Sequence, residues 1–164
     1  MITPSEIEEI REILKKSINP LYLFDDDPDG LCSFLLLRRY TKEGNGFAVK
    51  GKLGEDFIER LKYLGCDLIV ILDKPELDQE FIDQLSVPIL HIDHHEPLTI
   101  KAKNYHYYNP RIENDKDNRP TTYWAYKVTE NDLWLATIGY ITDWFIPEFL
   151  AEFNEKYPGL LPDK

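Results

Sequence analysis

The sequence predicts an α/β fold in which a mainly parallel sheet of about five strands is covered by helices on both faces. Short apolar runs alternate with longer segments whose apolar residues recur at helical spacing, and such alternation requires crossovers between parallel strands. The chain has 164 residues, which is enough for one compact domain with a hydrophobic core. Because the sequence shows no repeat, low-complexity tract or linker, residues 1–164 are predicted to form a single domain.

The first half of the chain begins with a predicted amphipathic helix over residues 5–17. Ser5 and Glu8 form a capping-box pattern, and Ile7, Ile10 and Leu14 follow at helical spacing. The next predicted elements are a strand at 21–24, an acidic turn at 25–30, a buried helix at 31–40, a strand at 47–49, a helix at 55–64 and a strand at 67–72.

The second half continues the alternation and then becomes helical. Its predicted elements are a short helix at 77–85, strands at 88–92 and 105–108, a polar loop at 111–119, and helices at 122–128 and 132–142. The tail, residues 155–164, contains two prolines and is expected either to precede a further segment or to fray.

Composition excludes several classes of protein. No apolar run approaches the roughly 20 residues that cross a bilayer, and the acidic N-terminus lacks the pattern of a secretory signal, so we expect a cytoplasmic protein. The net charge of −11 argues against a broad basic face for nucleic acid. Any polymeric substrate must therefore be held locally or by another domain. Cys32 and Cys66 lie in apolar segments and are predicted to be reduced core residues.

Acidic residues and histidines follow three of the predicted strands. Because ligands of parallel α/β sheets collect at the carboxyl ends of strands, we expect these groups to converge on one edge of the sheet. The side chains are Asp25, Asp27 and Asp29 after the first strand, Asp73 after the third, Asp93, His94 and His95 after the fourth, and Asp143 after the apolar stretch 133–141.

Metal binding is the favoured explanation for this set. Several carboxylates repel one another in a partly desolvated site unless protons or cations compensate them. Carboxylate oxygen with some imidazole nitrogen suits Mn²⁺, with Mg²⁺ as a second choice, and the absence of a CxxC pair argues against structural zinc. Helix capping alone would require only one or two aspartates. A calcium-binding EF-hand is disfavoured because Leu36 stands where the loop requires a bidentate glutamate.

Four segments, FDDDPDG, ILDKP, IDHH and GYITD, resemble in order and spacing the four motifs of the DHH phosphoesterase superfamily. The resemblance covers about residues 20–145 and is strongest to archaeal RecJ-like proteins. It implies a Rossmann-like DHH domain that uses two Mn²⁺ ions, or Mg²⁺, to hydrolyse phosphodiester bonds. Asp25 and Asp27 would hold one ion, Asp29, His94 and Asp143 the other, and Asp73 would bridge them. His95 would contact the scissile phosphate, so that Asp73, His94 and His95 form the catalytic set.

The sequence departs from the family pattern at two points. Leu23 stands where many relatives have a histidine, which leaves Asp25 as its substitute. Relatives also usually carry a second, C-terminal substrate-binding domain with a glycine-rich segment, and no such segment is present in these 164 residues. Either the sequence is a fragment of a longer chain, or a protein partner supplies those contacts, or the domain binds its substrate without hydrolysing it efficiently.

Several substrates and one different role remain open at this stage. A short single-stranded oligonucleotide is the favoured substrate, ahead of a cyclic dinucleotide or inorganic pyrophosphate. The different role is a RecJ-like scaffold or binding module in a replication or repair complex. Scaffolds commonly lose metal ligands, and because the ligands here are intact, an enzyme is preferred.

Overall fold

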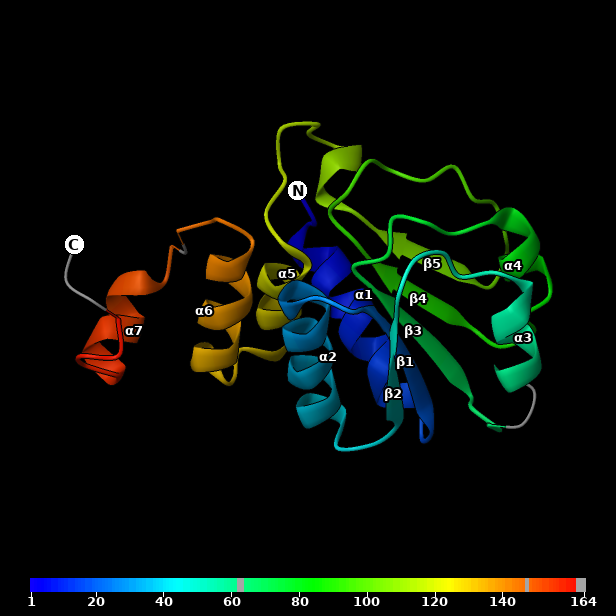
Figure 1. Cartoon of the computed structure of the whole chain (residues 1–164), viewed down its shortest axis with the longest axis horizontal. Helices are drawn as coiled ribbons and strands as arrows, with labels where there is room; N and C mark the ends of the chain where they lie inside the picture. Colours follow the sequence, from blue (N-terminus) through cyan, green and yellow to red (C-terminus); the bar gives the residue numbers. More distant parts are fainter. Residues whose placement is uncertain (62–63, 147, 162–164) are drawn as a thin grey trace.

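The computed structural model describes residues 1–61, 64–146 and 148–161 and confirms the predicted fold class. A single parallel sheet has the strand order β2-β1-β3-β4-β5 (Figure 1). The strands are β1 (Pro20–Asp25), β2 (Asn45–Val49), β3 (Leu68–Leu72), β4 (Ile89–Ile92) and β5 (Tyr105–Tyr108).

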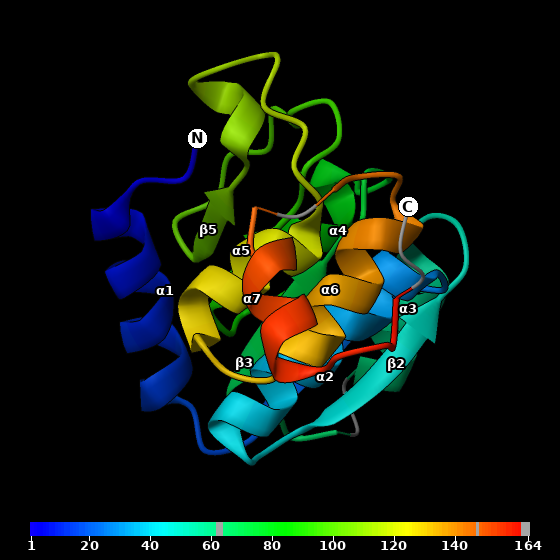
Figure 2. The same ribbon diagram turned by 90° about the vertical axis from the view of Figure 1, so that its left-hand side faces the viewer.

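The helices cover the two faces of the sheet unequally. Helices α3 and α4 lie on one face, while α1, α2 and α5 lie on the other, with α6 and then α7 further out (Figures 1 and 2). Their bounds are α1 (Pro4–Lys16), α2 (Pro28–Thr41), α3 (Glu55–Leu61), α4 (Gln79–Asp83), the 3-10 helix η1 (Pro110–Ile112), α5 (Thr121–Thr129), α6 (Leu133–Thr142) and α7 (Leu150–Lys156).

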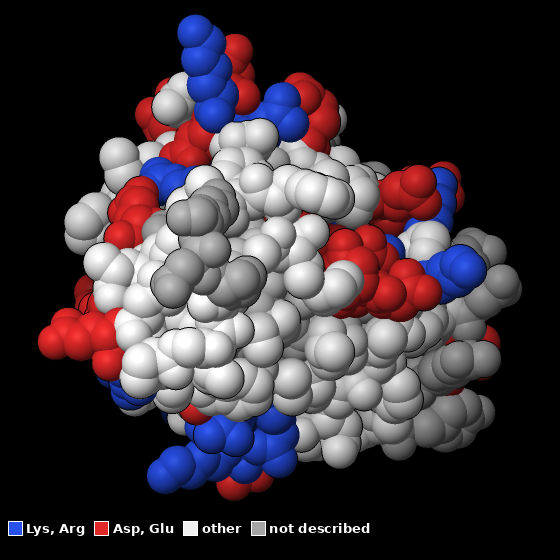
Figure 3. All heavy atoms as spheres, turned by 60° about the vertical axis from the view of Figure 1, so that its left-hand side comes forward, with Lys and Arg blue, Asp and Glu red and all other residues white. Residues whose placement is uncertain are grey.

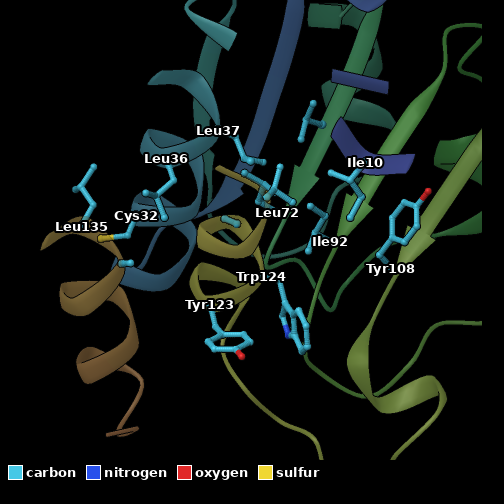
Figure 4. Packing of buried hydrophobic residues seen from close by; sticks show 14 of the residues in the cluster. Ile10, Cys32, Leu36, Leu37, Leu72, Ile92, Tyr108, Tyr123, Trp124 and Leu135 are labelled. Carbon is cyan, nitrogen blue, oxygen red and sulfur yellow. The ribbon is translucent and has the colours of Figure 1, made fainter. Parts of the chain in front are cut away.

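Alternation along the central strands divides the buried side chains into two cores. Tyr22 and Val70 face the larger core with α1, α2, α5 and α6, whereas Leu23 and Ile71 face the smaller core with α3 and α4. This division follows from the two-residue period of a strand. Figure 4 shows part of the larger core, to which Cys32 and Leu36 of α2, Trp124 of α5 and Leu72 at the end of β3 all belong. The core therefore fixes α2 and α5 relative to the carboxyl end of the sheet.

Local details differ from the sequence-based predictions at the ends of the chain. The cap of α1 is Thr3, whose side chain accepts from the Glu6 amide, so the predicted cap at Ser5 is wrong by two residues. Pro4 explains the shift because proline is favoured in the first turn of a helix. Helix α7 was not predicted. Residues 62 and 63 of the predicted helix 55–64, and residues 162–164 of the tail, lie outside the described residues. Cys32 and Cys66 are both free thiols, as predicted, but only Cys32 is fully buried in the core and Cys66 is half-buried.

The outer side of α6 exposes large apolar side chains to solvent. Trp134, Ile138 and Ile141 recur at helical spacing and are each more than a third exposed, and Trp144 beyond the helix is 96% exposed. Figure 3, which brings this side of the molecule forward, shows a broad surface with few charged side chains. Among the described helices, none combines the length and the apolar character needed to cross a membrane.

Candidate metal centre

The acidic turn joins β1 to α2 and places three aspartates in different environments. Asp25 is the last residue of β1, Asp27 is the N-cap of α2, and Asp29 lies in the first turn of that helix. The Asp27 carboxylate accepts from the Gly30 amide at 2.9 Å. Gly30 lets the helix approach the strand closely, since a Cβ there would lie 2.5 Å from the carbonyl oxygen of Asp25. The turn thus directs Asp29 inward, where it is 2% exposed.

The buried Asp29 carboxylate also anchors the N-terminus of α5. Its two oxygens accept from the amides of Thr121 and Thr122, at 2.8 and 2.7 Å. Amides at a helix N-terminus have no partner within the helix and favour a negative charge. Asp29 is therefore held by α5, more than 90 residues further along the chain.

Asp73 lies at the centre of the acidic residues. It follows β3 directly, is 1% exposed, and has a φ of 59°. This left-handed conformation is unfavourable for a residue with a Cβ and is frequent at functional sites. The hydroxyl of Thr121 donates to Asp73 Oδ1 at 3.2 Å, so the same helix N-terminus positions both Asp29 and Asp73.

The His94 imidazole joins three of the predicted carboxylates. Its Nδ1 lies 3.1 Å from the carbonyl oxygen of Asn118, and because a carbonyl only accepts, Nδ1 carries a proton. Nε2 then faces the carboxylates, at 3.4 Å from Asp73 Oδ1, 3.7 Å from Asp29 Oδ2 and 3.9 Å from Asp143 Oδ2. Segments distant in sequence therefore converge at the carboxyl edge of the sheet, as predicted.

The ionisable groups perturb one another strongly in this arrangement. Burial, reinforced by the charge of Asp73, raises the pKa of Asp29 well above its usual value. Burial also raises the pKa of Asp143 and of Asp27. Burial would lower the pKa of His94, but its hydrogen bond to Asp73 and the negative charges of Asp73 and Asp29 raise it to about 9. A cation in contact with these oxygens would relieve the same repulsion.

His95 points to a different partner from His94. Its Nδ1 lies 2.8 Å from Asp93 Oδ1, and this hydrogen bond raises the pKa of His95. Asp93 is fully buried, and the Asn109 amide donates to its other oxygen at 3.3 Å and to the His95 carbonyl at 3.0 Å. Asp93 thus orients the His95 ring through one nitrogen, as predicted, and the ring remains 40% exposed.

The structure brings together most of the predicted ligands, although their roles in metal binding stay predictions. Donor atoms of Asp73, His94 and His95 lie within 4.8 Å of one another, as do those of Asp29, His94 and Asp143. Asp25 differs, because its Oδ1 accepts from the Lys74 ammonium at 2.7 Å. Leu23, at the family's histidine position, is buried in the smaller core.

Several residues that shape the site were not assigned from the sequence. Thr121 and Thr122 follow a proline at a helix start, a pattern that predicts the helix but not its contact with the aspartates. Asn109 directly follows the predicted strand 105–108, and Lys74 belongs to the segment ILDKP, in which no role was assigned to it. Arg119, at the end of the polar loop, is paired with Asp117 at 2.6 Å and lies over the ring of Tyr123.

The residues fit a divalent cation of the hard to borderline class. Oxygens of Asp29, Asp73 and Asp143 each lie within 4 Å of the same imidazole nitrogen, Nε2 of His94. The neighbouring nitrogen of His94 is satisfied by a backbone carbonyl, which is the usual arrangement behind a ligating histidine. Oxygen-rich ligands of this kind suit Mn²⁺ or Mg²⁺, whereas structural zinc sites are rich in cysteine sulfur.

Comparisons with known proteins agree with this fold. Residues 22–154 match the family model for the DHH family, N-terminal domain. No curated protein matches the chain. RecJ in complex with Mn²⁺ from Thermus thermophilus is similar, with a TM-score of 0.63 and 16% identity over 91% of this chain and 23% of that chain.

A second solved structure, exonuclease RecJ bound to manganese, gives a TM-score of 0.63 and 17% identity over 84% of this chain and 43% of that chain. Similarity at these identities establishes the fold, and our chain spans less than half the length of either RecJ chain. Since the family model covers most of the sequence and the four motif segments meet at one edge of the sheet, the chain belongs to the DHH family, whose N-terminal domain it contains.

Proposed function

We propose that this protein is a metal-dependent phosphoesterase that hydrolyses phosphodiester bonds, with short single-stranded oligonucleotides as its substrates. The observation that carries the proposal is the convergence of Asp29, Asp73 and Asp143 around Nε2 of His94. The similarity to RecJ structures that contain Mn²⁺, one of them described as an exonuclease, supports the same reaction class.

Asp29, Asp73, His94 and Asp143 would hold one Mn²⁺ ion, and Asp27 with Asp73 would contribute to a second position. When bound, such ions activate water as a nucleophile near neutral pH and neutralise charge that develops on phosphate oxygens. The chain itself supplies geometry. The α5 amides fix Asp29, the Thr121 hydroxyl fixes Asp73, and Asn118 fixes the tautomer of His94.

His95 is the best-placed residue for contact with the scissile phosphate. Its Nδ1–H is engaged by Asp93, which leaves Nε2 as the second hydrogen-bonding atom of a partly exposed ring. The raised pKa favours the imidazolium, which can donate to a phosphate oxygen and supply a proton to the departing oxygen. His95 is therefore proposed as a catalytic residue together with Asp73 and His94.

We further propose that residues 1–164 form the metal-binding half of the functional enzyme. A net charge of −11 gives little general attraction for a nucleic acid, so a second domain or a protein partner would provide further substrate contacts. A scaffolding role is the second candidate, and the exposed apolar side chains of Trp134, Ile138 and Trp144 favour it because such patches commonly contact proteins.

Incubation with Mn²⁺ and a labelled oligonucleotide tests the proposed reaction. We expect product from the wild-type protein and a loss of at least about a hundredfold in Asp73→Asn, which removes a central charge while conserving shape. Asp83→Asn is the matched control, since Asp83 is exposed at the end of α4. Equal activity in Asp73→Asn would identify a contaminating nuclease. Metal binding without product, together with a co-purifying protein, would favour the scaffold.

A further inference from the structure

Lys74 is a buried cation at the edge of the candidate metal centre. Its side chain is 2% exposed, and its ammonium donates to Asp25 Oδ1 at 2.7 Å and to the carbonyl oxygen of Val49, at the end of β2, at 3.0 Å. A buried lysine persists only when its charge is paired and its hydrogen bonds are satisfied. Here the charge is paired with Asp25, and two of the three ammonium donors have acceptors, so Lys74 is held in one position by the fold.

The conformation of Asp73 separates the functions of two adjacent side chains. Asp73 has a left-handed φ of 59°, and its carboxylate contacts Thr121 and His94. The next side chain, Lys74, instead reaches Asp25 on β1. The two adjacent residues thus contact different members of the acidic cluster. Asp73 adds a negative charge beside His94, and Lys74 adds a positive charge beside Asp25.

The two ends of the cluster consequently differ in charge balance. Around His94, oxygens of Asp29, Asp73 and Asp143 face one imidazole nitrogen within 4 Å, and Asp73 has a second imidazole nitrogen, Nδ1 of His95, at 3.7 Å. At the other end Asp25 already has a full positive charge at hydrogen-bonding distance. Among the described residues, the groups whose donor atoms lie close enough to hold an ion include neither Asp25 nor Asp27.

We propose that the Lys74 ammonium takes the place of a metal charge beside Asp25, so that the two metal positions are unequal. One divalent ion binds tightly at Asp29, Asp73, His94 and Asp143. A second ion, near Asp27 and Asp25, binds weakly because it meets the repulsion of Lys74 and because Asp25 is engaged. Asp25 is then a positioning residue rather than a direct ligand. This inference rests on the proposed metal site and concerns its stoichiometry.

Mn²⁺ binding to the whole chain, followed by calorimetry and by the electron paramagnetic resonance signal of the bound ion, tests the proposal. The wild type is expected to bind one ion tightly and to give the signal of an isolated Mn²⁺. Lys74→Met removes the charge and is expected to tighten the second ion at least about tenfold, with the appearance of a spin-coupled signal. Lys74→Arg restores the charge and is expected to behave as the wild type.

Lys52→Met is the control, because Lys52 is an exposed lysine that pairs with Asp78 and not with Asp25. It is expected to leave both affinities unchanged. Two ions of similar affinity in the wild type, or no change in Lys74→Met, would overturn the inference while leaving the proposed function intact. A wild-type protein that binds no Mn²⁺ would overturn the proposed function itself.

A second variant covers the case in which Lys74→Met fails to fold without metal. Asp25→Asn keeps an oxygen that can accept from Lys74 and removes only the carboxylate charge. Because the inference makes Asp25 a positioning residue, the tight Mn²⁺ affinity is expected to stay within about threefold of the wild type. A loss of more than about tenfold would show that Asp25 binds the tight ion directly, and the inference would be rejected.

Discussion

At the scale of single residues, His94 supplies the positive charge that offsets the carboxylates of the metal-free site. Its Nε2 faces Asp73, Asp29 and Asp143 within 4 Å, and these charges hold it as an imidazolium up to a pH of about 9. A bound metal ion would replace that proton, since a ligating histidine must be neutral. The proton and the metal therefore compete for the same nitrogen.

This competition predicts opposite effects of pH on stability and on metal binding. The raised pKa of His94 stabilises the folded, metal-free protein below its unfolded pKa of about 6.5, and this contribution is lost as the pH rises through about 9. The raised pKa of Asp29 acts in the same direction. Thermal unfolding in chelator between pH 6.5 and 9.5 should show a falling Tm.

Mn²⁺ affinity should instead rise over the same pH range, by up to about tenfold per pH unit, because binding releases the His94 proton. Calorimetry in buffers of different ionisation enthalpy measures that release directly. In His94→Gln the metal-free Tm should depend less on pH, because the imidazolium is absent. A metal-free Tm that rises with pH in the wild type would contradict the assignment of His94.

The residues that carry charge at this site were predictable from the sequence, but their supports were not. Asp29, Asp73, His94 and Asp143 stand at strand ends or after an apolar stretch, where topology alone brings them together. Thr121 and Asn109 act through distances of a few ångströms to residues far away in sequence. Such contacts depend on the angle at which a helix packs or on the path of a loop, and the hydrophobic periodicity of the sequence determines neither.

At the scale of elements, the site depends on how α2, α5 and α6 pack together. Gly139 of α6 marks the closest approach, because a Cβ there would lie 2.3 Å from the Thr122 hydroxyl oxygen and 2.9 Å from the Cys32 Cβ. The Thr122 amide in turn donates to Asp29. Close helix packing in the larger core is thus linked to the position of a metal-site carboxylate.

Gly139→Ala should therefore weaken both stability and metal binding. Overpacking at this contact is expected to lower the free energy of unfolding by about 1–3 kcal/mol and to displace Thr122 from Asp29. Chemical denaturation and Mn²⁺ titration measure the two effects. Gly54→Ala is the control, since nothing lies within 4 Å of a Cβ at Gly54. If Gly139→Ala lost stability but bound Mn²⁺ normally, α6 would support the fold without positioning the site.

The order of helices and strands was predicted well because short apolar runs alternate clearly with segments of helical spacing. The ends of the helices were predicted less well. The N-cap of α1 is Thr3 because Pro4 begins the helix, whereas the capping-box pattern in the sequence predicted Ser5. Helix α7 was missed because its seven residues, Leu150–Lys156, bury only Phe153. A helix with so narrow a buried face gives little periodic signal.

At the scale of the whole molecule, the net charge of −11 opposes the compact state. Part of this charge is concentrated at the carboxyl edge of the sheet, where cations would neutralise it. Binding to the folded state alone stabilises a protein according to the ligand concentration relative to its dissociation constant. Metal binding and folding should therefore be coupled in this chain.

Saturating Mn²⁺ should raise the Tm. At a free concentration one hundred times the dissociation constant the stabilisation is about 2.7 kcal/mol, which corresponds to about 5–10 °C for a domain of this size. Differential scanning calorimetry with and without chelator measures the change. Asp73→Asn should lose most of it, whereas Asp83→Asn, remote from the site, should retain it. An unchanged Tm in the wild type would mean that the acidic edge holds no ion.

The exposed Trp144 gives this chain a natural optical reporter. Its indole is 96% exposed and directly follows Asp143, while Trp124 is buried in the larger core. A paramagnetic ion held by Asp143 would quench the adjacent indole of Trp144, which shares the red-shifted emission with the partly exposed Trp134, and leave the buried Trp124 nearly unaffected. Occupancy of the site and integrity of the core would thus be visible in separate parts of one fluorescence spectrum, without any attached label.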